Sequence, residues 1–248
     1  VYGVGEQHLE ILLSKLKNKY KIDAELSEPI IPFRETIKSK VEVRGKYKKQ
    51  SGGHGQFGDV LMSFEPLGDL TKSYEFEEKI FGGSVPKQYF PAVEKGIQEC
   101  VLNGVLAGYP VVGLKATLLD GSYHPVDSSE MAFKMATSMA FKDGLTRARP
   151  TILEPVVHAE VLAPEKYMGD IMGDINKRRG RILKMDPEGK NMRISAEVPE
   201  VEMFKYCTDL RSMTQSRGEY TYHFERYEEA PPEVQQEVIN KRKAEKQG

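Results

Sequence analysis

Residues 120–143 constrain the fold of this chain most strongly, because they read as a turn, a short loop and a capped helix. The dipeptide Asp120-Gly121 is a turn signal after an alternating strand, and residues 127–130 have the D-x-x-E spacing of a capping box. We therefore expect a helix to begin near Ser128, with His124 on a five-residue loop before it. A loop fixed at both ends by a strand and a capped helix can present a side chain to a partner.

The expected helix carries a wide apolar face that requires burial. Methionine and alanine recur along it every four residues, as Met131, Met135, Met139 and, beside them, Ala132, Ala136 and Ala140. Recurrence at this spacing is typical of a helix that packs on a core. The sequence thus predicts that this helix anchors the His124 loop to a hydrophobic core.

Serine, histidine and acidic residues lie close together around His124, which raises the question of catalysis. Residues adjacent on one loop rarely reach the mutual geometry of a nucleophilic triad. The aspartate and serines are better interpreted as helix caps, each contributing about 1 kcal/mol to the helix. A merely exposed or hydrogen-bonded histidine remains the alternative interpretation of His124.

Composition gives few indications of partners. The net charge is -1 although 29% of the 248 residues are charged, so any affinity for nucleic acid must come from local patches. Cys100 and Cys207 lie in apolar helical patterns, which favours buried, reduced thiols in a cytosolic protein. No metal-ligand spacing, signal peptide or apolar run near eighteen residues occurs, so we expect neither a metal site, secretion nor a membrane span.

The first part of the chain looks like the tail of a preceding domain. Residues 5–20 have helical spacing, the next six residues read as a strand, and Pro29 and Pro32 mark a boundary. One helix and one strand do not make a domain alone. We therefore interpret the chain as a piece of a larger protein, with a new domain starting after residue 28.

A basic hairpin with a glycine-rich tip follows. Arg44, Lys46, Lys48 and Lys49 end its first strand, and residues 53–58 match G-x-G-x-x-G. A dinucleotide site requires these glycines to open a helix, whereas a strand follows here. A flexible loop without a task is one alternative; the favoured interpretation is a basic finger that approaches a phosphate backbone through its amides and lysines.

The rest of this domain and the next are expected from their periodicity. We predict a strand over 74–80, a helix from Pro86 to Gly108 and a strand over 111–119, with the domain ending near Pro150. The pattern from Leu153 to residue 227 is β-α-β-β-α-β, the ferredoxin-like order, with helices from Pro164 to Gly180 and from about Glu200 to Gly218. The remaining tail predicts a surface helix.

A cluster of basic residues lies at the end of the first helix in this second domain and in the following strand: Lys177, Arg178, Arg179, Arg181 and Lys184. The positive charge suits the helix dipole. A solvated basic surface and a contact with RNA phosphates are both compatible with the pattern.

Five segments together resemble one family: GVGEQHLEIL, SGGHGQFGDV, VPKQYFPAVEKGI, LAGYPVVGLKATLLDGSYHPVDSSEMAFKMA and EPVVHAEVLAPEKYMGDIMGDINKRRGRI. They resemble the C-terminal half of bacterial elongation factor G over nearly the whole chain. The resemblance implies an α+β chain, with a domain like ribosomal protein S5 domain 2 followed by a ferredoxin-like domain. Residues 1–27 would end domain III, 28–151 form domain IV, 152–230 form domain V and 231–248 a C-terminal helix or tail.

The resemblance also implies a function. The chain would be the ribosome-binding part of a cytoplasmic, monomeric translational GTPase that promotes GTP-dependent translocation of tRNA and mRNA, without a membrane. The tip of domain IV would contact the 16S rRNA decoding centre through Ser51, Gly52, Gly53, His54, Gly55, Gln56, Tyr123, His124 and Asp127. Domain V would contact the sarcin-ricin and GTPase-centre regions of 23S rRNA through Lys177, Arg178, Arg179 and Arg181. His124 matches the tip histidine that is modified in the eukaryotic counterpart; we expect no modification here.

Two departures from the family pattern qualify this transfer. The GTPase domain and domain II are absent, so we expect no catalytic or cofactor site in this chain, and GTP and Mg²⁺ would belong to the full-length protein. His54 stands where arginine is usual, and Asp59 where histidine is more usual, which lowers the positive charge expected near RNA. These changes resemble elongation factor G-like paralogues, so a recycling or rescue factor is the second hypothesis. A ribosomal-protection protein is the third, ranked lowest because Phe57 and Tyr123 are the only bulky aromatic residues expected at the tip.

Overall fold

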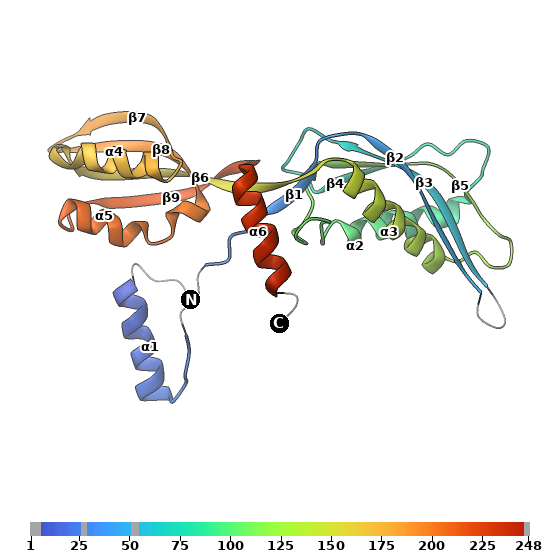
Figure 1. Cartoon of the computed structure of the whole chain (residues 1–248), viewed down its shortest axis with the longest axis horizontal. Helices are drawn as coiled ribbons and strands as arrows, with labels where there is room; N and C mark the ends of the chain where they lie inside the picture. The colour runs from blue at the N-terminus through green and yellow to red at the C-terminus, as the bar shows by residue number, and fades with distance from the viewer. Residues whose placement is uncertain (1–5, 26–28, 51–54, 246–248) are drawn as a thin grey trace. The chain divides into compact units, whose positions relative to one another are not determined.

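The computed structural model describes residues 6–25, 29–50 and 55–245. The chain divides into two compact units, one formed by 1–32 and 154–228, the other by 33–153 and 229–248 (Figure 1). Both units combine helices with a sheet, which confirms the predicted mixed α/β class. The boundary between them falls within one long strand, after Leu153.

The second unit is built on a four-stranded sheet in the order β2-β3-β5-β4. Its strands are β2 (Val41–Lys49), β3 (Gln56–Pro66), β4 (Tyr74–Glu78) and β5 (Leu114–Ser122). The β2–β3 and β3–β5 pairs are antiparallel, and β4 is parallel to β5. The β2–β3 hairpin predicted from the sequence is therefore present, and it is the longest pairing in this sheet.

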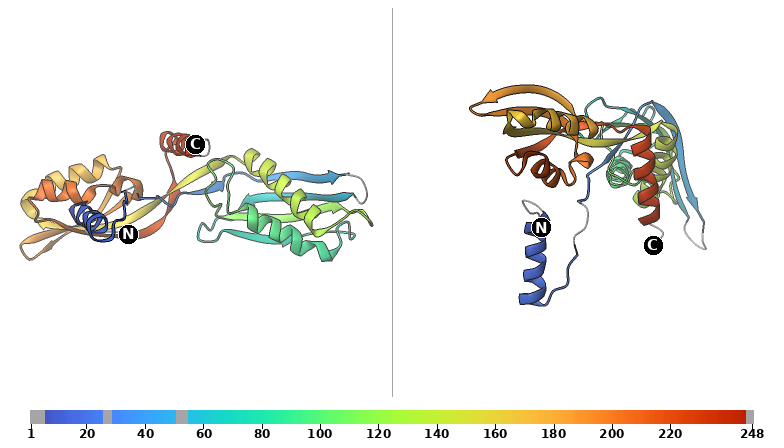
Figure 2. Two further views of the ribbon diagram at one scale, coloured as in Figure 1. Left: turned by 90° about the horizontal axis from the view of Figure 1, so that it is seen from below. Right: turned by 60° about the vertical axis from the view of Figure 1, so that its left-hand side comes forward.

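Helices α2 (Phe90–Cys100) and α3 (Glu130–Arg147) pack against each other and cover one face of this sheet (Figures 1 and 2). A 3-10 turn, Lys87–Tyr89, precedes α2. The same unit contains β1 (Arg34–Ile37), the start of β6 (Pro150–Pro164) and α6 (Pro232–Glu245). The helix predicted for the tail is thus α6.

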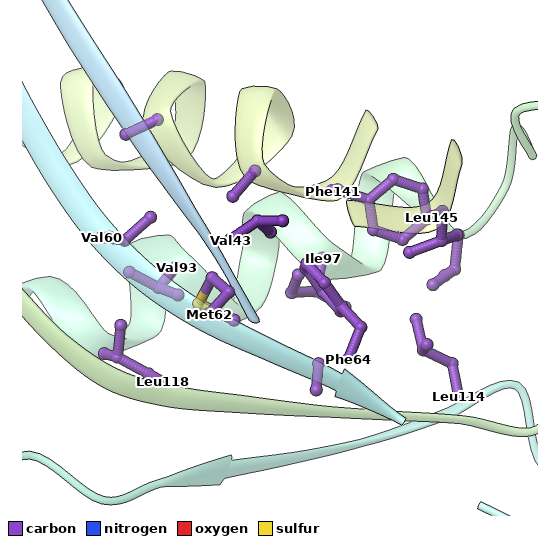
Figure 3. Close-up of a cluster of buried hydrophobic side chains, with 14 of the residues drawn as sticks. Val43, Val60, Met62, Phe64, Val93, Ile97, Leu114, Leu118, Phe141 and Leu145 are labelled. Atoms are coloured by element: carbon purple, nitrogen blue, oxygen red, sulfur yellow. The ribbon is translucent and has the colours of Figure 1, made fainter. Parts of the chain in front are cut away.

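The core of this unit lies between the sheet and the two helices (Figure 3). The strands supply Met62 and Phe64 from β3 and Leu114 and Leu118 from β5, and the helices supply Val93, Ile97, Phe141 and Leu145. The rings of Phe64 and Phe141 meet edge to face with centroids 5.8 Å apart. Each such side chain stabilises the fold by roughly 1.5–3 kcal/mol when fully buried, so this cluster holds α3 firmly on the sheet.

The predicted apolar face of α3 is only half correct. Ala132, Ala136 and Ala140 are fully buried, but Met131, Met135 and Met139 are exposed at 56%, 39% and 47%. The core face is completed instead by larger residues, among them Phe133, Phe141 and Leu145. A spacing of four residues fits two neighbouring stripes of one helix equally well, and only packing decides which is buried.

The predicted start of α3 also needs correction. The N-cap is Ser129, whose side chain accepts a hydrogen bond from the Ala132 amide at 3.2 Å, and not Asp127. The helix therefore begins at Glu130, two residues later than predicted. Asp127 is left outside the helix, with its carboxylate available for another contact.

Three other predictions are wrong. Residues 21–25 form no strand, α2 ends at Cys100 rather than at Gly108, and Asp120-Gly121 lies within β5 rather than in a turn. Gly121 is required there by close approach, because a Cβ atom would lie 2.3 Å from the carbonyl oxygen of Asp59 on the neighbouring strand. A glycine in an extended strand thus resembled a turn in the sequence.

Residues 101–113 form a loop because a buried carboxylate organises their backbone. Glu35, on β1 and only 1% exposed, accepts hydrogen bonds from the amides of Leu106, Ala107, Gly108 and Tyr109 at 2.9–3.1 Å. If these residues were helical, the same amides would instead donate to backbone carbonyl oxygens of the preceding turn. The carboxylate therefore stabilises the loop in place of the predicted last turns of α2.

The first unit has the predicted ferredoxin-like order. After β6 come α4 (Met168–Lys177), β7 (Arg181–Glu188), β8 (Asn191–Pro199), α5 (Tyr206–Thr214) and β9 (Glu219–Glu229), and the strands lie in the order β9-β6-β8-β7. Three-residue and four-residue 3-10 turns, Glu165–Tyr167 and Glu200–Met203, precede the two helices. Alternate residues of β6 and β8 pack against α4 and α5 in one core. Helix α1 (Glu6–Tyr20) belongs to the N-terminal segment.

Replacing Glu35 with alanine should lower the free energy of unfolding by roughly 3 kcal/mol, because several buried amides lose their acceptor together. Urea denaturation of the variant measures this loss. Glu94→Ala, which removes an exposed carboxylate from α2, is the matched control and should change stability by less than about 0.5 kcal/mol. Equal stability of the two variants would contradict the role given to Glu35.

Candidate nucleic-acid interface

The hairpin of β2 and β3 carries the first predicted tip loop. Its register runs from Val41 opposite Phe64 to Lys49 opposite Gln56. Ser51, Gly52, Gly53 and His54 lie outside the described residues. Gly55 and Gln56 are described, and β3 starts at Gln56. The glycine motif is thus followed by a strand, as predicted, and not by the helix that a dinucleotide site needs.

Helix α3 lies unusually close to this hairpin. A Cβ atom on Gly45 of β2 would lie 2.1 Å from the carbonyl oxygen of Ala136, and one on Gly58 of β3 would lie 2.3 Å from that of Ala132. No side chain fits at either glycine, so backbone meets backbone. The N-terminal end of α3, and the His124 loop before it, are therefore fixed beside the loop end of the hairpin.

The two tip loops are joined by hydrogen bonds. The Asp127 carboxylate accepts one from the Gly55 amide at 3.1 Å, and the Asp127 carbonyl oxygen accepts one from the Phe57 amide at 2.8 Å. The Ser128 hydroxyl donates to the Phe57 carbonyl oxygen at 3.0 Å and accepts from the His124 amide at 2.8 Å. The structure therefore brings Gly55 of one predicted tip loop together with His124 and Asp127 of the other.

His124 is exposed, and its ring orientation is fixed from one side. Its Nδ1 atom accepts hydrogen bonds from the amides of Val126 at 3.3 Å and Asp127 at 3.2 Å. An Nδ1 atom that accepts from amides carries no proton itself, so the proton of the neutral ring is on Nε2. The carboxylate oxygen of Asp127 that lies 3.4 Å from Nδ1 is then a neighbour of the ring and not its hydrogen-bond partner. The outward Nε2–H group can donate to an acceptor on a partner.

The sequence did not predict the contacts that Phe57, Lys46 and Ser128 make at the tip. The ring of Phe57 lies 6.5 Å from that of His124, and the Lys46 ammonium lies 5.6 Å from the centroid of the Phe57 ring. Ser128 joins both loops, as described above. Tyr123 is exposed beside His124. The lysine and the aromatic ring could have been identified from strand alternation, since they lie near the loop end of the same hairpin.

Asp59 offsets the positive charge of the hairpin through an ion pair with Arg44 and is not exposed at the tip. It lies on β3, buried, where both carboxylate oxygens accept from the Arg44 guanidinium at 2.8 Å and one also accepts from the Ser122 hydroxyl. Hydrogen bonds from Arg44 and Ser122 outweigh burial and lower the pKa of the Asp59 carboxyl. Asp59 therefore links β2, β3 and β5 below the tip and faces no partner.

The basic cluster of the other unit is largely paired within its own domain. Arg178 contacts the carboxylates of Asp174 and Asp209, and Arg179 makes a two-pronged contact with the buried Glu154 at 2.7 and 2.8 Å. Lys177 is exposed beside them. These contacts give Arg178 and Arg179 a structural role that the sequence did not reveal.

The end of α4 shows why the cluster is compact. Arg179 adopts a left-handed backbone conformation, with φ of 57°, and the Gly180 amide donates to the Ile175 carbonyl oxygen at 2.8 Å. The left-handed residue is thus the arginine and not the glycine predicted to end the helix. Gly180 is needed for space, since a Cβ atom there would lie 2.6 Å from the Ile175 side chain.

Arg181 is exposed and shares a carboxylate with a second arginine. Glu197 on β8 accepts from Arg226 at 2.7 and 2.8 Å and also from Arg181. These contacts, led by that of Arg226, hold the pKa of Glu197 at about 2. Among the residues that the structure describes, no group of three or more His, Cys, Asp or Glu could hold a metal ion, and no helix is long and apolar enough to cross a membrane.

Comparison with known proteins gives two family matches and a similar structure. Residues 29–149 match the family "Elongation factor G, domain IV", and residues 151–238 match "Elongation factor G C-terminus". A crystal structure of a protein from Thermus thermophilus is 45% identical, covers 98% of this chain and superposes with a TM-score of 0.88. The chain spans 36% of the length of that protein.

The Glu197 contacts predict a pH dependence of stability. Because folding lowers the pKa of this carboxyl from 4.5 to about 2, its contribution is complete above about pH 4.5 and is lost as the pH falls towards 2. Glu197→Gln should therefore destabilise the domain at pH 6 and approach the stability of the unaltered protein towards pH 2. Denaturant titrations across this range measure the difference. Glu165→Gln, which alters an exposed carboxyl, should give a difference that is small at every pH, and a constant difference for Glu197→Gln would contradict the assignment.

Proposed function

Since this chain belongs to the elongation factor G family, of which it contains domain IV and the C-terminal domain, we propose that it is the ribosome-engaging part of a translational GTPase that moves tRNA and mRNA through the ribosome. GTP and Mg²⁺ would act in the full-length protein. The tip formed by the His124 loop and the glycine-rich loop would contact RNA of the small-subunit decoding centre together with the tRNA and mRNA.

The observation that carries this proposal is the construction of the tip. Two loops from distant parts of the sequence meet through Asp127 and Ser128, and helix α3 supports them from behind. They present the Nε2–H group of His124 and, nearby, a lysine over an aromatic ring. Donors and cations on a supported surface suit the acceptors and negative charge of an RNA strand.

The proposed action is mechanical. Hydrolysis of GTP in the full-length protein would bias a conformational change, and the tip would occupy the space vacated by the moving tRNA and mRNA. A tip of fixed shape is needed for this task, because a loop that yields under load could not prevent backward movement. The packing of α3 on the sheet supports such a shape.

His124→Ala in the full-length protein should slow single-codon movement of the ribosome by roughly tenfold, because one hydrogen bond to RNA is lost at the tip. A primer-extension assay of ribosome position after addition of GTP measures the three-nucleotide shift and its rate. Met135→Ala, which alters an exposed side chain on α3 away from the loops, is the control and should move ribosomes at the normal rate.

A normal rate for His124→Ala would refute the role of the tip. If the unaltered protein produced no shift while ribosome-stimulated GTP hydrolysis remained intact, translocation itself would be the wrong function. A recycling or rescue factor would then be favoured, and separation of ribosomal subunits with a recycling partner would be the next assay.

We also propose that the C-terminal domain contacts large-subunit rRNA, in the sarcin-ricin and GTPase-centre regions, through the exposed part of its basic cluster. Arg178 and Arg179 are engaged by carboxylates of the same domain, so Lys177 is the residue whose charge is available. Lys177→Ala should reduce the slope of log affinity against log salt concentration by somewhat less than one unit, as expected for one phosphate contact. Ribosome binding of the full-length protein at several salt concentrations measures this slope. An unchanged slope would show that the cluster has a structural role only.

A further inference from the structure

We propose that Asp127 is a positioning residue that holds Gly55 and Phe57, where the glycine-rich loop enters β3, against the His124 loop. This inference rests on the proposed function of the tip. It assigns Asp127 a role through other residues, in place of the direct RNA contact that the family resemblance implies for it.

Asp127 contacts the other loop with both its side chain and its backbone. Its carboxylate accepts from the Gly55 amide at 3.1 Å, and its carbonyl oxygen accepts from the Phe57 amide at 2.8 Å. The side chain is only 29% exposed, because it is turned towards the hairpin. One residue therefore fixes two amides, at the last residue of the glycine-rich loop and near the start of β3.

The same residue also borders His124. Its amide donates to Nδ1 of His124 at 3.2 Å, and its carboxylate lies 3.4 Å from that atom. Because Nδ1 is occupied from the side of Asp127, the ring presents Nε2 outward. The direction of the His124 ring and the positions of the Gly55 and Phe57 amides thus depend on one residue.

Gly55 leaves little space at its contact with the Asp127 carboxylate. A Cβ atom on Gly55 would lie 3.0 Å from the Asp127 carboxyl group, closer than side chains ordinarily approach. The glycine therefore allows the carboxylate to reach the backbone amide. This complementarity is expected of a contact between two loops and has no counterpart in a residue that faces RNA.

The electrostatics agree with an inward role. A carboxylate presented to an RNA strand would be repelled by the phosphates. At its observed place the charge of Asp127 is directed to a backbone amide, and a charged acceptor makes a stronger hydrogen bond than a neutral one. The tip therefore contains a negative group that is directed towards the hairpin and is only partly exposed.

Hydrogen exchange of the 248-residue chain tests the contact directly. In Asp127→Ala the Gly55 amide should exchange about tenfold faster, since it loses a hydrogen bond to an ionised acceptor. In Asp127→Asn it should exchange within about threefold of the unaltered protein, because the amide oxygen of asparagine can accept the same bond. Glu130→Ala, which removes an exposed carboxylate three residues away, should leave Gly55 unchanged. Unchanged exchange in Asp127→Ala, with the fold intact by circular dichroism, would overturn the proposal.

Rescue by asparagine is the functional test. In the full-length protein Asp127→Ala should slow codon movement about tenfold, whereas Asp127→Asn should restore it to within about threefold. If Asp127 served only the stability of the fold, the variants would change thermal stability, but the rate of codon movement would not fall with alanine and recover with asparagine. Equal slowing by alanine and asparagine would show that the charge itself acts, and would overturn a positioning role.

The two proposals fail separately. If Gly55 exchange changes as expected while His124→Ala moves ribosomes normally, Asp127 joins the loops but the tip does not serve translocation. If His124→Ala slows movement while neither Asp127 variant alters exchange or rate, the function of the tip stands and the positioning role of Asp127 is wrong.

Discussion

The close approach of helix α3 to the β2–β3 hairpin is the constraint on which the rest of the domain IV structure depends. At Gly45 and Gly58 the helix backbone lies where a Cβ atom would be, and Ala132, Ala136 and Ala140 are the small residues that permit it. Larger side chains in the same core cluster, Phe133, Phe141 and Leu145, hold it there. The position of the helix is therefore fixed both by backbone contact with the hairpin and by the buried core.

From this position the construction of the tip follows. The start of α3 lies beside the end of the hairpin, so the loop before the helix meets the loop between the strands. Among the described residues, Asp127 and Ser128 contribute the side-chain hydrogen bonds between the two loops, main-chain groups supply their partners, and the rings of Phe57 and His124 lie near each other. Such a surface depends little on long, mobile side chains, which suits the contact with RNA that we propose for it. Below it, Arg44, Asp59 and Ser122 join the three strands that carry the loops.

The sequence was sufficient for the order of the elements and for the candidate tip, and insufficient where tertiary contacts override local patterns. Strand alternation and helix periodicity predicted the hairpin, α3 and the ferredoxin-like order, because each is a local signal. The end of α2 could not be predicted, since the loop after it is stabilised by Glu35, distant in the sequence. The exposure of Met131 and the left-handed Arg179 likewise depend on neighbours brought together by folding.

The candidate interface shows the same limit. His124 and the glycine-rich loop were identified from their motifs, but the bond between Asp127 and Gly55 joins residues 72 apart. Charge in the sequence was the less reliable guide, because a residue type does not reveal its partner. Asp59 suggested a less positive tip and Arg178 a free cation, yet each is paired within its own domain.

Hydroxyl-radical probing from the tip can test whether the two loops form one RNA-contacting surface, as we propose. Single cysteines at Gln56 and at Tyr123, in a full-length protein whose native cysteines, Cys100 and Cys207 among them, are replaced, would each carry a tethered iron chelate. On the ribosome, we expect both positions to cleave overlapping nucleotides of the small-subunit decoding region. Cleavage at separate sites, or none in the small-subunit RNA, would contradict it.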